Sequence, residues 1–255
     1  MQLIDTHAHL YDAAFAAERP AVVARCQAAG VQRVYLPNLD VHTVAPMLAL
    51  HHAYPRWCRP MLGLHPCHVK GDFQAQLTQL EGLLGKHPFC AIGEVGLDFY
   101  HDTRFRSQQL QALRVQLGWA LQHRLPVVLH CRAALQEALA LLSEPAYANL
   151  RGIFHCFSGT LAQGRRAIEL GFLLGVGGVV TFKNAGLAEV VGQLPLQALV
   201  LETDSPYLAP TPHRGRRNDP SLLPYIAARV AELHATTPAR VAAVTAALAL
   251  QLLEK

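Results

Sequence analysis

Two histidines, His7 and His9, stand two residues apart where the first apolar segment ends, in the stretch IDTHAHL. In a β-strand, residues i and i+2 point to the same face, so both imidazoles would project to one side. Such a pair can bind a metal ion, but a lone His-x-His pair is more often exposed to solvent or hydrogen-bonded to the backbone. The pair therefore predicts a metal site only if further ligands occur downstream.

Further residues of metal-ligand type stand at or near the ends of later apolar segments. They are His65 in GLHP, Glu94 in AIGEVGLDFY, His130 in VVLHCR, His155 in GIFHCFSG and Asp204 in LVLETDSPYL. One such residue alone can be explained as a cap on a carbonyl or on the following helix. Because the same pattern recurs in separate segments, one shared metal centre explains it better.

Short runs rich in Val, Ile and Leu alternate with longer helical patterns along the chain. Candidate strands cover residues 3–6, 33–37, 60–64, 90–95, 126–129, 152–154, 172–176 and 199–202. Candidate helices cover residues 20–29, 41–52, 73–86, 104–123, 133–142, 161–170, 187–192, 220–234 and 238–253.

This alternation favours a parallel sheet with right-handed crossovers, and about eight units fit an α/β fold of the closed (β/α)8 TIM barrel type. A doubly wound open sheet is the alternative, but no glycine-rich dinucleotide motif follows the first segment. In a TIM barrel the catalytic groups come from the C-terminal ends of the strands, where the metal-type residues are expected. No linker or convincing repeat divides the sequence, so we expect a single domain over residues 1–255.

Composition and charge narrow the function classes only a little. The chain is 51% hydrophobic, and its longest apolar stretches, such as residues 241–253, are too short to span a bilayer, so no membrane contact is expected. Polar residues interrupt the N-terminal segment where an export signal would need an apolar run, which predicts a cytoplasmic protein. Six cysteines without C-x-x-C spacing indicate reduced, mostly buried thiols. The net charge of +4 is compatible with a polyanionic substrate.

The sequence resembles the TatD family of metal-dependent hydrolases over nearly its whole length. The matching motifs are DTHAHL, GLHP, IGEVGLDFY, HCR, HCFSG, LETDSPYL and RRNDP, and GVGGVVTFKNA is similar to the YjjV-like branch. Two positions depart from the family pattern. Ala133 stands where the family often has an acidic residue, and Leu248 lies in a C-terminal helix that lacks the family's Asn followed by Leu-Phe. These departures put substrate preference or packing in question rather than hydrolysis.

The resemblance implies a centre of two divalent metal ions, Zn, Mn, Mg or similar. In this assignment Glu94 bridges the ions, one site is completed by His7, His9 and Asp204, and the other by His130 and His155. Imidazole with carboxylate ligands suits Zn, Mn, Fe or Co. Two ions about 3.5–4 Å apart lower the pKa of a bound water and stabilise both oxygens of a phosphoester displacement. Asp204 is the expected general base, and Glu94 is the expected bridging carboxylate.

The expected substrate contacts are weaker predictions. They are His65 and the basic segment HRGRRNDP, with Arg214, Arg216, Arg217 and Asn218. A loop hydrogen bond explains His65 almost as well, and a solvated basic loop explains the others. Asp98 and Tyr100 could either orient a ligand or tie down their loop.

Three function classes remain open from the sequence. The resemblance implies a metal-dependent phosphodiesterase, a deoxyribonuclease acting on DNA, with no obligate protein partner evident. The alternative is an amidohydrolase-type C–N or carboxylic ester hydrolase, for example on aminoacyl esters, that uses the same metals. A non-catalytic metal-binding protein is the third, and a candidate base with a basic loop on the same face argues against it.

Overall fold

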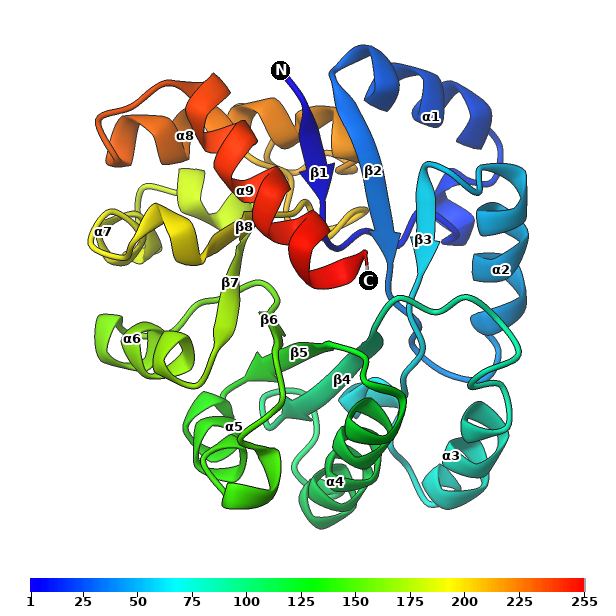
Figure 1. Ribbon diagram of the computed structural model, residues 1–255. Coiled ribbons are helices and arrows are strands. Elements are labelled where there is room, and N and C mark those ends of the chain that lie inside the picture. Colours follow the sequence, from blue (N-terminus) through cyan, green and yellow to red (C-terminus); the bar gives the residue numbers. More distant parts are fainter. Residues whose placement is uncertain (255) are drawn as a thin grey trace.

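Eight parallel strands surround a common axis in the computed structural model, which describes residues 1–254 (Figure 1). They are β1 (Leu3–Asp5), β2 (Val31–Leu36), β3 (Cys58–Pro60), β4 (Ile92–Asp98), β5 (Val127–Arg132), β6 (Gly152–Phe154), β7 (Phe172–Val176) and β8 (Leu199–Leu201). Strands β1 to β3 pair in one set and β4 to β8 in another. The bridges Leu62–Ile92 and Ala8–Ser205 join the two sets, so the sheet closes into the TIM barrel that the sequence predicts.

Helices follow the strands, and all but the last of them form the outer layer (Figure 1). They are α1 (Arg19–Ala28), α2 (Val44–Ala53), α3 (Phe73–Glu81), α4 (Arg106–His123), α5 (Leu135–Leu142), α6 (Leu161–Glu169), α7 (Leu187–Val191), α8 (Leu223–Leu233) and α9 (Pro238–Leu253). Capping hydrogen bonds from side chains mark where several of these helices begin. Thr160 and Gln163 form a capping box before α6, and the Thr237 side chain accepts a hydrogen bond from Arg240 N at the start of α9.

The sixth and seventh strands have their predicted bounds, and the third and fourth differ most from theirs. The third was expected at residues 60–64, but only Cys58–Pro60 pairs continuously, and Leu62 contributes a single bridge. The fourth runs on to Asp98, so Glu94 lies within a fully buried strand rather than at its end. Unbroken burial on both faces removes the polar alternation that would have marked where this strand ends.

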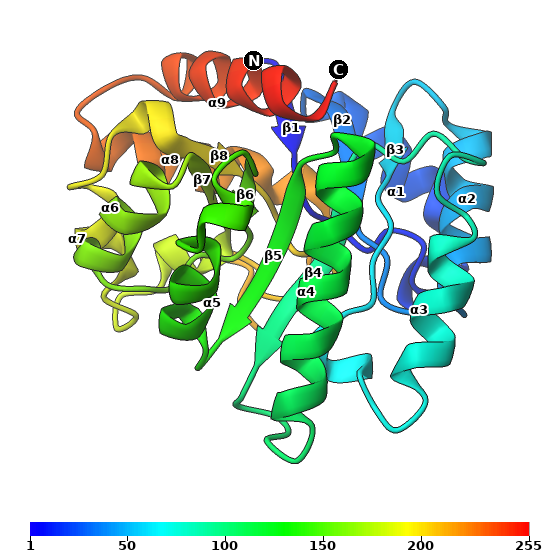
Figure 2. The same ribbon diagram turned by 60° about the horizontal axis from the view of Figure 1, so that its bottom comes forward.

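Helix α9 closes the N-terminal mouth of the barrel. Figure 2 shows it lying across one end while β4 and β5 point toward the other. Apolar residues from the barrel interior pack against it, including Tyr35 and Met61 against Ala249 and Leu253. Leu248, one of the departures from the family pattern, packs against the same cluster, so this departure affects the closed end of the barrel.

A carboxylate just after α9 binds the end of this helix to strands of the barrel. Glu254 Oε1 accepts a hydrogen bond from the Tyr35 hydroxyl at 2.9 Å and lies 3.1 Å from both Arg33 and Arg59. Within residues 1–254, no single helix is long and apolar enough to cross a membrane, although the bent pair Pro220–Leu233 and Pro238–Leu253 passes that test by length and composition.

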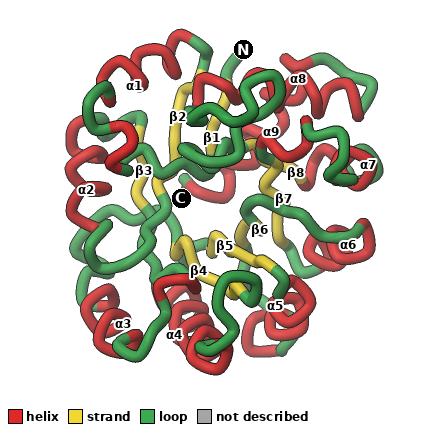
Figure 3. Tube along the Cα trace, turned by 180° about the vertical axis from the view of Figure 1, so that it is seen from behind, coloured by secondary structure: helices red, strands yellow, loops and turns green. Residues whose placement is uncertain are grey.

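The opposite, C-terminal mouth is covered by loops (Figure 3). Asp5 ties two of these loops together at the seam between β1 and β8. One oxygen of its carboxylate accepts hydrogen bonds from His7 N at 3.1 Å and Thr203 N at 3.0 Å, and the other accepts from Thr203 Oγ1 at 2.5 Å. Both loops carry candidate site residues, so this buried carboxyl fixes their relative position.

We expect Asp5→Ala to lower the free energy of unfolding by at least about 1–3 kcal/mol, because it leaves buried backbone N–H groups without an acceptor. Urea denaturation of the metal-free protein measures this change. Asp5→Asn is the matched control, since its amide oxygen still accepts from both N–H groups. Wild-type stability in Asp5→Ala would show that Asp5 does not brace these loops.

Candidate metal centre

The six residues predicted as metal ligands converge at the C-terminal mouth of the barrel. His7 and His9 follow β1, Glu94 lies in β4, His130 in β5, His155 just after β6 and Asp204 just after β8. All but His130 and Asp204 are buried, and those two are partly buried. Parallel strands place their carboxyl ends at the same mouth, which is why distant segments of the sequence meet here.

Glu94 lies at the middle of the cluster. Its Oε2 is 3.1 Å from His7 Nε2 and 3.7 Å from His9 Nε2. Its Oε1 is 3.0 Å from His130 Nδ1 and 3.1 Å from His155 Nε2. Oε2 therefore faces His7 and His9, whereas Oε1 faces His130, His155 and a third imidazole, which divides the cluster into two halves.

Asp204 joins the half that contains His7 and His9. Its Oδ1 lies 3.5 Å from His9 Nε2 and 3.8 Å from His7 Nε2. Its backbone has φ of 56°, in the left-handed region that few residues other than glycine adopt, and its N–H donates to His7 O at 2.9 Å. This sharp turn after β8 aims the carboxylate into the mouth.

His65 joins the other half. Its Nε2 lies 3.3 Å from Glu94 Oε1, and its Nδ1 accepts a hydrogen bond from Cys67 N at 3.0 Å. Burial lowers the pKa of His65 to about 4, so the ring is neutral near pH 7. Because Nδ1 is the acceptor, the neutral ring carries its proton on Nε2, which donates to Glu94. The expected contact between His65 and a substrate phosphate stays a prediction.

Two buried carboxylates orient the histidines of this second half from behind. His130 Nε2 lies 2.9 Å from Asp98 Oδ2, and His155 Nδ1 lies 3.2 Å from Glu202 Oε1. Cys156 N also donates to Glu202 Oε1, at 2.5 Å. Carboxylates in this position fix the orientation of a ligand histidine and raise its basicity. Asp98 therefore orients a candidate ligand, which is one of the two roles that the sequence left open for it.

Glu202 was missed in the sequence analysis. The signal was an acidic residue directly after an apolar strand, two positions before Asp204, in LVLETD. The neighbouring strand β7 also leaves room for the Glu202 carboxylate. A Cβ at Gly175 would lie 2.3 Å from Glu202 Oε2, so β7 needs a glycine where the carboxylate passes.

Electrostatics in the metal-free cluster follow from this packing. Burial alone would raise the pKa of Glu94, but His65, His155 and His7 around it hold that pKa well below its ordinary value. Burial alone would lower the pKa of His155, but Glu94 and Glu202 outweigh it and raise that pKa well above its usual range. His7 has a lowered pKa, because burial and the stacked His155 ring, 3.7 Å away, both disfavour its charged form. The cluster therefore combines carboxylates with both neutral and protonated imidazoles.

The donor set fits divalent metal ions. Three groups of ligand atoms each lie within 4.8 Å of one another, namely His7–His9–Glu94, His7–His155–Asp204 and His65–Glu94–His130. Neutral imidazole and carboxylate together suit Zn, Mn, Fe or Co. Glu94 belongs to groups on both sides, which is the position of a bridging ligand.

The cluster lies in a pocket of about 730 Å³. Its wall includes Arg132, Tyr207 and Leu208 beside the histidines, and Glu94 and Asp204 lie within the lining. Arg132 is exposed, with its guanidinium carbon 4.3 Å from the centre of the Tyr100 ring. A basic and an aromatic side chain therefore flank the candidate ligands.

The four residues predicted from the basic segment lie outside this lining. Arg214 packs over the Phe182 ring at 4.1 Å, and Arg217 is bonded to Glu18 and to the carbonyl of Ala14. Substrate contact by Arg214, Arg216 and Arg217 stays a prediction that this geometry does not favour.

Asn218 differs from these three arginines. It is fully buried, and its amide donates to the carbonyls of Thr203 at 2.8 Å and Tyr207 at 2.6 Å. It therefore holds the loop after β8, and the expected substrate contact of Asn218 stays a prediction that this burial does not favour.

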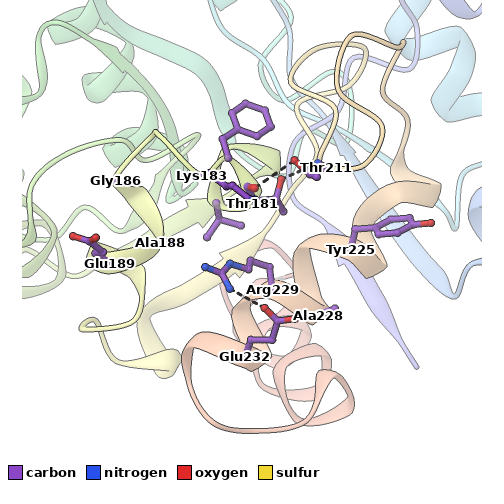
Figure 4. Close-up of a pocket in the computed structure, with 12 residues that line it drawn as sticks. Thr181, Lys183, Gly186, Ala188, Glu189, Thr211, Tyr225, Ala228, Arg229 and Glu232 are labelled. Carbon is purple, nitrogen blue, oxygen red and sulfur yellow. Dashed lines mark hydrogen bonds and ion pairs between the residues drawn. The ribbon is translucent and has the colours of Figure 1, made fainter.

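A second hollow of about 500 Å³ lies near α7 and α8 (Figure 4). Lys183, Tyr225 and Arg229 line it, and Arg229 is already paired with Glu232 at 2.8 Å. None of the clustered ligand-type histidines reaches it among the described residues. The pocket above Glu94 is therefore the candidate catalytic site.

Comparison with known proteins agrees with this geometry. A family model described as "TatD related DNase" matches residues 4–254. The chain belongs to the TatD family of metal-dependent hydrolases. It is 35% identical to the "3'-5' ssDNA/RNA exonuclease TatD" of Salmonella typhimurium over 99% of both chains. It is 34% identical to the "Uncharacterized metal-dependent hydrolase YjjV" of Escherichia coli over 91% of this chain and 90% of that protein.

The fold agrees as well. The crystal structure of YjjV from Escherichia coli has a TM-score of 0.93 and 30% identity over 99% of this chain and 98% of that one. The resemblance inferred from the motifs is thus confirmed, and the TatD-type barrel with it.

We expect Glu202→Ala to weaken metal binding about 10–100-fold, because His155 loses the partner that sets its orientation and basicity. Metal titration by calorimetry measures this change. Glu202→Gln should lose less, since the amide oxygen can still accept from His155 Nδ1 and Cys156 N. Unchanged affinity in Glu202→Ala would mean that this carboxylate does not support a ligand.

Proposed function

We propose that this TatD-family protein hydrolyses phosphodiester bonds of single-stranded nucleic acid, DNA in particular, with two divalent ions. The observation that carries the proposal is the placement of Glu94, whose two oxygens face separate sets of imidazoles at 3.0–3.7 Å. In this assignment His7, His9 and Asp204 would hold one ion, and His130 and His155 would hold the other. Two such ions, when bound, lower the pKa of a water and stabilise both oxygens of the displacement.

Asp204 is suited to act as the general base. Burial would raise its pKa, but the hydrogen bond with His9 and the nearby His155 and His7 lower that pKa, so the carboxylate is ionised at neutral pH. Its side chain is 15% exposed and lines the pocket, within reach of the substrate space. It can take a proton from the attacking water and pass it to the leaving oxygen.

The pocket wall supports a single-stranded substrate. Tyr207 is 54% exposed, and its ring centre lies 6.1 Å from that of His9. An exposed aromatic ring beside the reacting centre can stack a nucleobase whatever its sequence. Arg132 can fork onto a phosphate beside it. The name of the Salmonella relative, a 3'-5' ssDNA/RNA exonuclease, agrees with this class of substrate.

Asp204→Asn should lower the turnover of single-stranded DNA by roughly 10²–10⁴-fold, because the amide keeps the shape of the side chain but cannot accept the proton. Steady-state kinetics on an end-labelled oligonucleotide measure the loss, and metal analysis of the same sample shows whether the ions remain. Near-normal turnover would exclude Asp204 as the base.

Arg132→Ala should weaken binding of single-stranded DNA and flatten the log–log dependence of affinity on salt by about 0.7, the value of one phosphate contact. Binding is measured from about 50 to 200 mM salt, where such contacts weaken visibly. Arg165→Ala is the matched control, an exposed arginine on α6 outside the pocket lining. Equal slopes in wild type and Arg132→Ala would exclude the contact.

Tyr207→Ala tests stacking separately. We expect it to weaken binding of single-stranded DNA by about 1–3 kcal/mol, the contribution of one stacked base, with little change in the salt slope. Tyr207→Phe should bind like wild type, because it keeps the ring.

An ester and amide panel completes these measurements. If the wild type hydrolyses a carboxylic ester or amide well and leaves DNA and RNA intact at every salt concentration, the nuclease proposal is wrong and the hydrolase alternative replaces it.

A further inference from the structure

A further group of ligand-type side chains lies beside the metal centre, on the pocket wall. It comprises Cys67, in the 3-10 turn Pro66–His68, Asp98 at the end of β4, and His101 in the following loop. Cys67 Sγ lies 3.5 Å from Asp98 Oδ2 and 3.9 Å from His101 Nδ1, and His101 Nδ1 lies 2.8 Å from Asp98 Oδ2. The proposed two-metal centre uses none of these three as ligands.

The triangle of donor atoms has the size that a zinc ion requires. With Zn–S about 2.3 Å and Zn–N and Zn–O about 2.0–2.1 Å, a tetrahedral ion separates its ligand atoms by roughly 3.3–3.6 Å. The observed edges of 2.8, 3.5 and 3.9 Å bracket these values, so small side-chain adjustments would suffice. Sulfur, nitrogen and oxygen each come from a different residue, as in mixed zinc sites.

The charges around Asp98 also favour a cation. Among residues 1–254, Asp98 has no ion pair with a lysine or arginine, and its carboxylate faces His101 and His130. The nearby Lys70 is paired with Asp102 at 3.2 Å. Asp98 Oδ1 is fixed by the backbone N–H groups of Tyr100 and His101, so Oδ2 is the oxygen that faces the triangle.

We propose that Cys67, Asp98 and His101 bind a third divalent cation of the Zn²⁺ class. Cys67 binds as the thiolate, and its proton leaves to solvent. Cys67 and His101 both line the pocket, so the fourth ligand position opens toward it and takes water or an oxygen of a bound anion. The thiolate makes this site selective for Zn²⁺ or Co²⁺ over Mg²⁺ and Mn²⁺.

Cobalt gives the sharpest test, because a thiolate bound to Co²⁺ produces a near-ultraviolet charge-transfer band that imidazole and carboxylate ligands do not. Protein stripped with a chelator is titrated with Co²⁺ while absorption and bound equivalents are followed. We expect the wild type to show the band, and Cys67→Ser to lose it together with one equivalent of cobalt.

Two further variants make the result specific. Cys131→Ser changes another thiol that lines the pocket, and it should keep the band. His101→Gln removes a ligand whose side chain is 53% exposed, so it should weaken cobalt binding at this site without harming the fold. Thermal unfolding of the stripped variants checks that each is folded.

The outcomes separate this proposal from the two-metal centre. Loss of the band in Cys67→Ser, with the remaining equivalents retained, supports the third site. If the wild type shows the band but binds fewer cobalt equivalents than two sites and a third require, the result counts against the two-metal centre and leaves the third site standing. No band in the folded wild type, or a band that survives in Cys67→Ser, would overturn the third site. The same cobalt stoichiometry in folded wild type and Cys67→Ser would also overturn it.

Discussion

The buried carboxylate of Glu94 is the group on which the arrangement of the site depends. It is 2% exposed, and a charge buried to that degree is strongly unfavourable unless neighbouring groups stabilise it. His7, His130 and His155 supply imidazole nitrogens at 3.0–3.1 Å, and each comes from a different strand. The carboxylate is therefore satisfied only when β1, β4, β5 and β6 are assembled in one register. The same geometry leaves its two oxygens facing separate sets of imidazoles, so the requirement of the fold and that of the proposed two-metal centre coincide.

The barrel meets this requirement by separating apolar from polar residues along its axis. At the N-terminal mouth, interior side chains such as Tyr35 and Met61 pack against α9, and Glu254 fastens that helix. At the other mouth the interior is polar, and Asp5 and Asn218 satisfy the backbone of the loops that carry His7 and Asp204. One end can be closed and rigid because nothing has to enter there. The other can hold charged groups because every strand delivers its last residues to it.

The sequence predicted the barrel and the position of the candidate ligands together, because the ligand-type residues recur with the same period as the predicted strands. Ligand-type residues recur on or just after five of the eight strands, so one pattern predicts both the barrel and the convergence of the six residues. Glu202 was missed because its partner, His155, lies on another strand, and pairing across strands has no local signature. The contacts by which Asn218 holds its loop were not predicted, because a buried amide and an exposed one look alike in a polar loop. Helix bounds were close where capping residues mark them, as at Thr160, whereas the bounds of β4 were not, because it is buried on both faces.

The residues around Glu94 and the residues of the pocket wall have different roles. The residues around Glu94 set the class of chemistry, while Cys67, His101, Arg132 and Tyr207 come from the segments that shape the pocket wall. These two sets are not independent, because Asp98 Oδ2 faces His130 Nε2 at 2.9 Å and also belongs to the Cys67–His101 triangle. A cation on Asp98 would draw electron density from the carboxylate and weaken its hold on the proton of His130. Since that hold sets the basicity of His130 as a ligand, a change in a loop could alter the metal centre without touching the substrate.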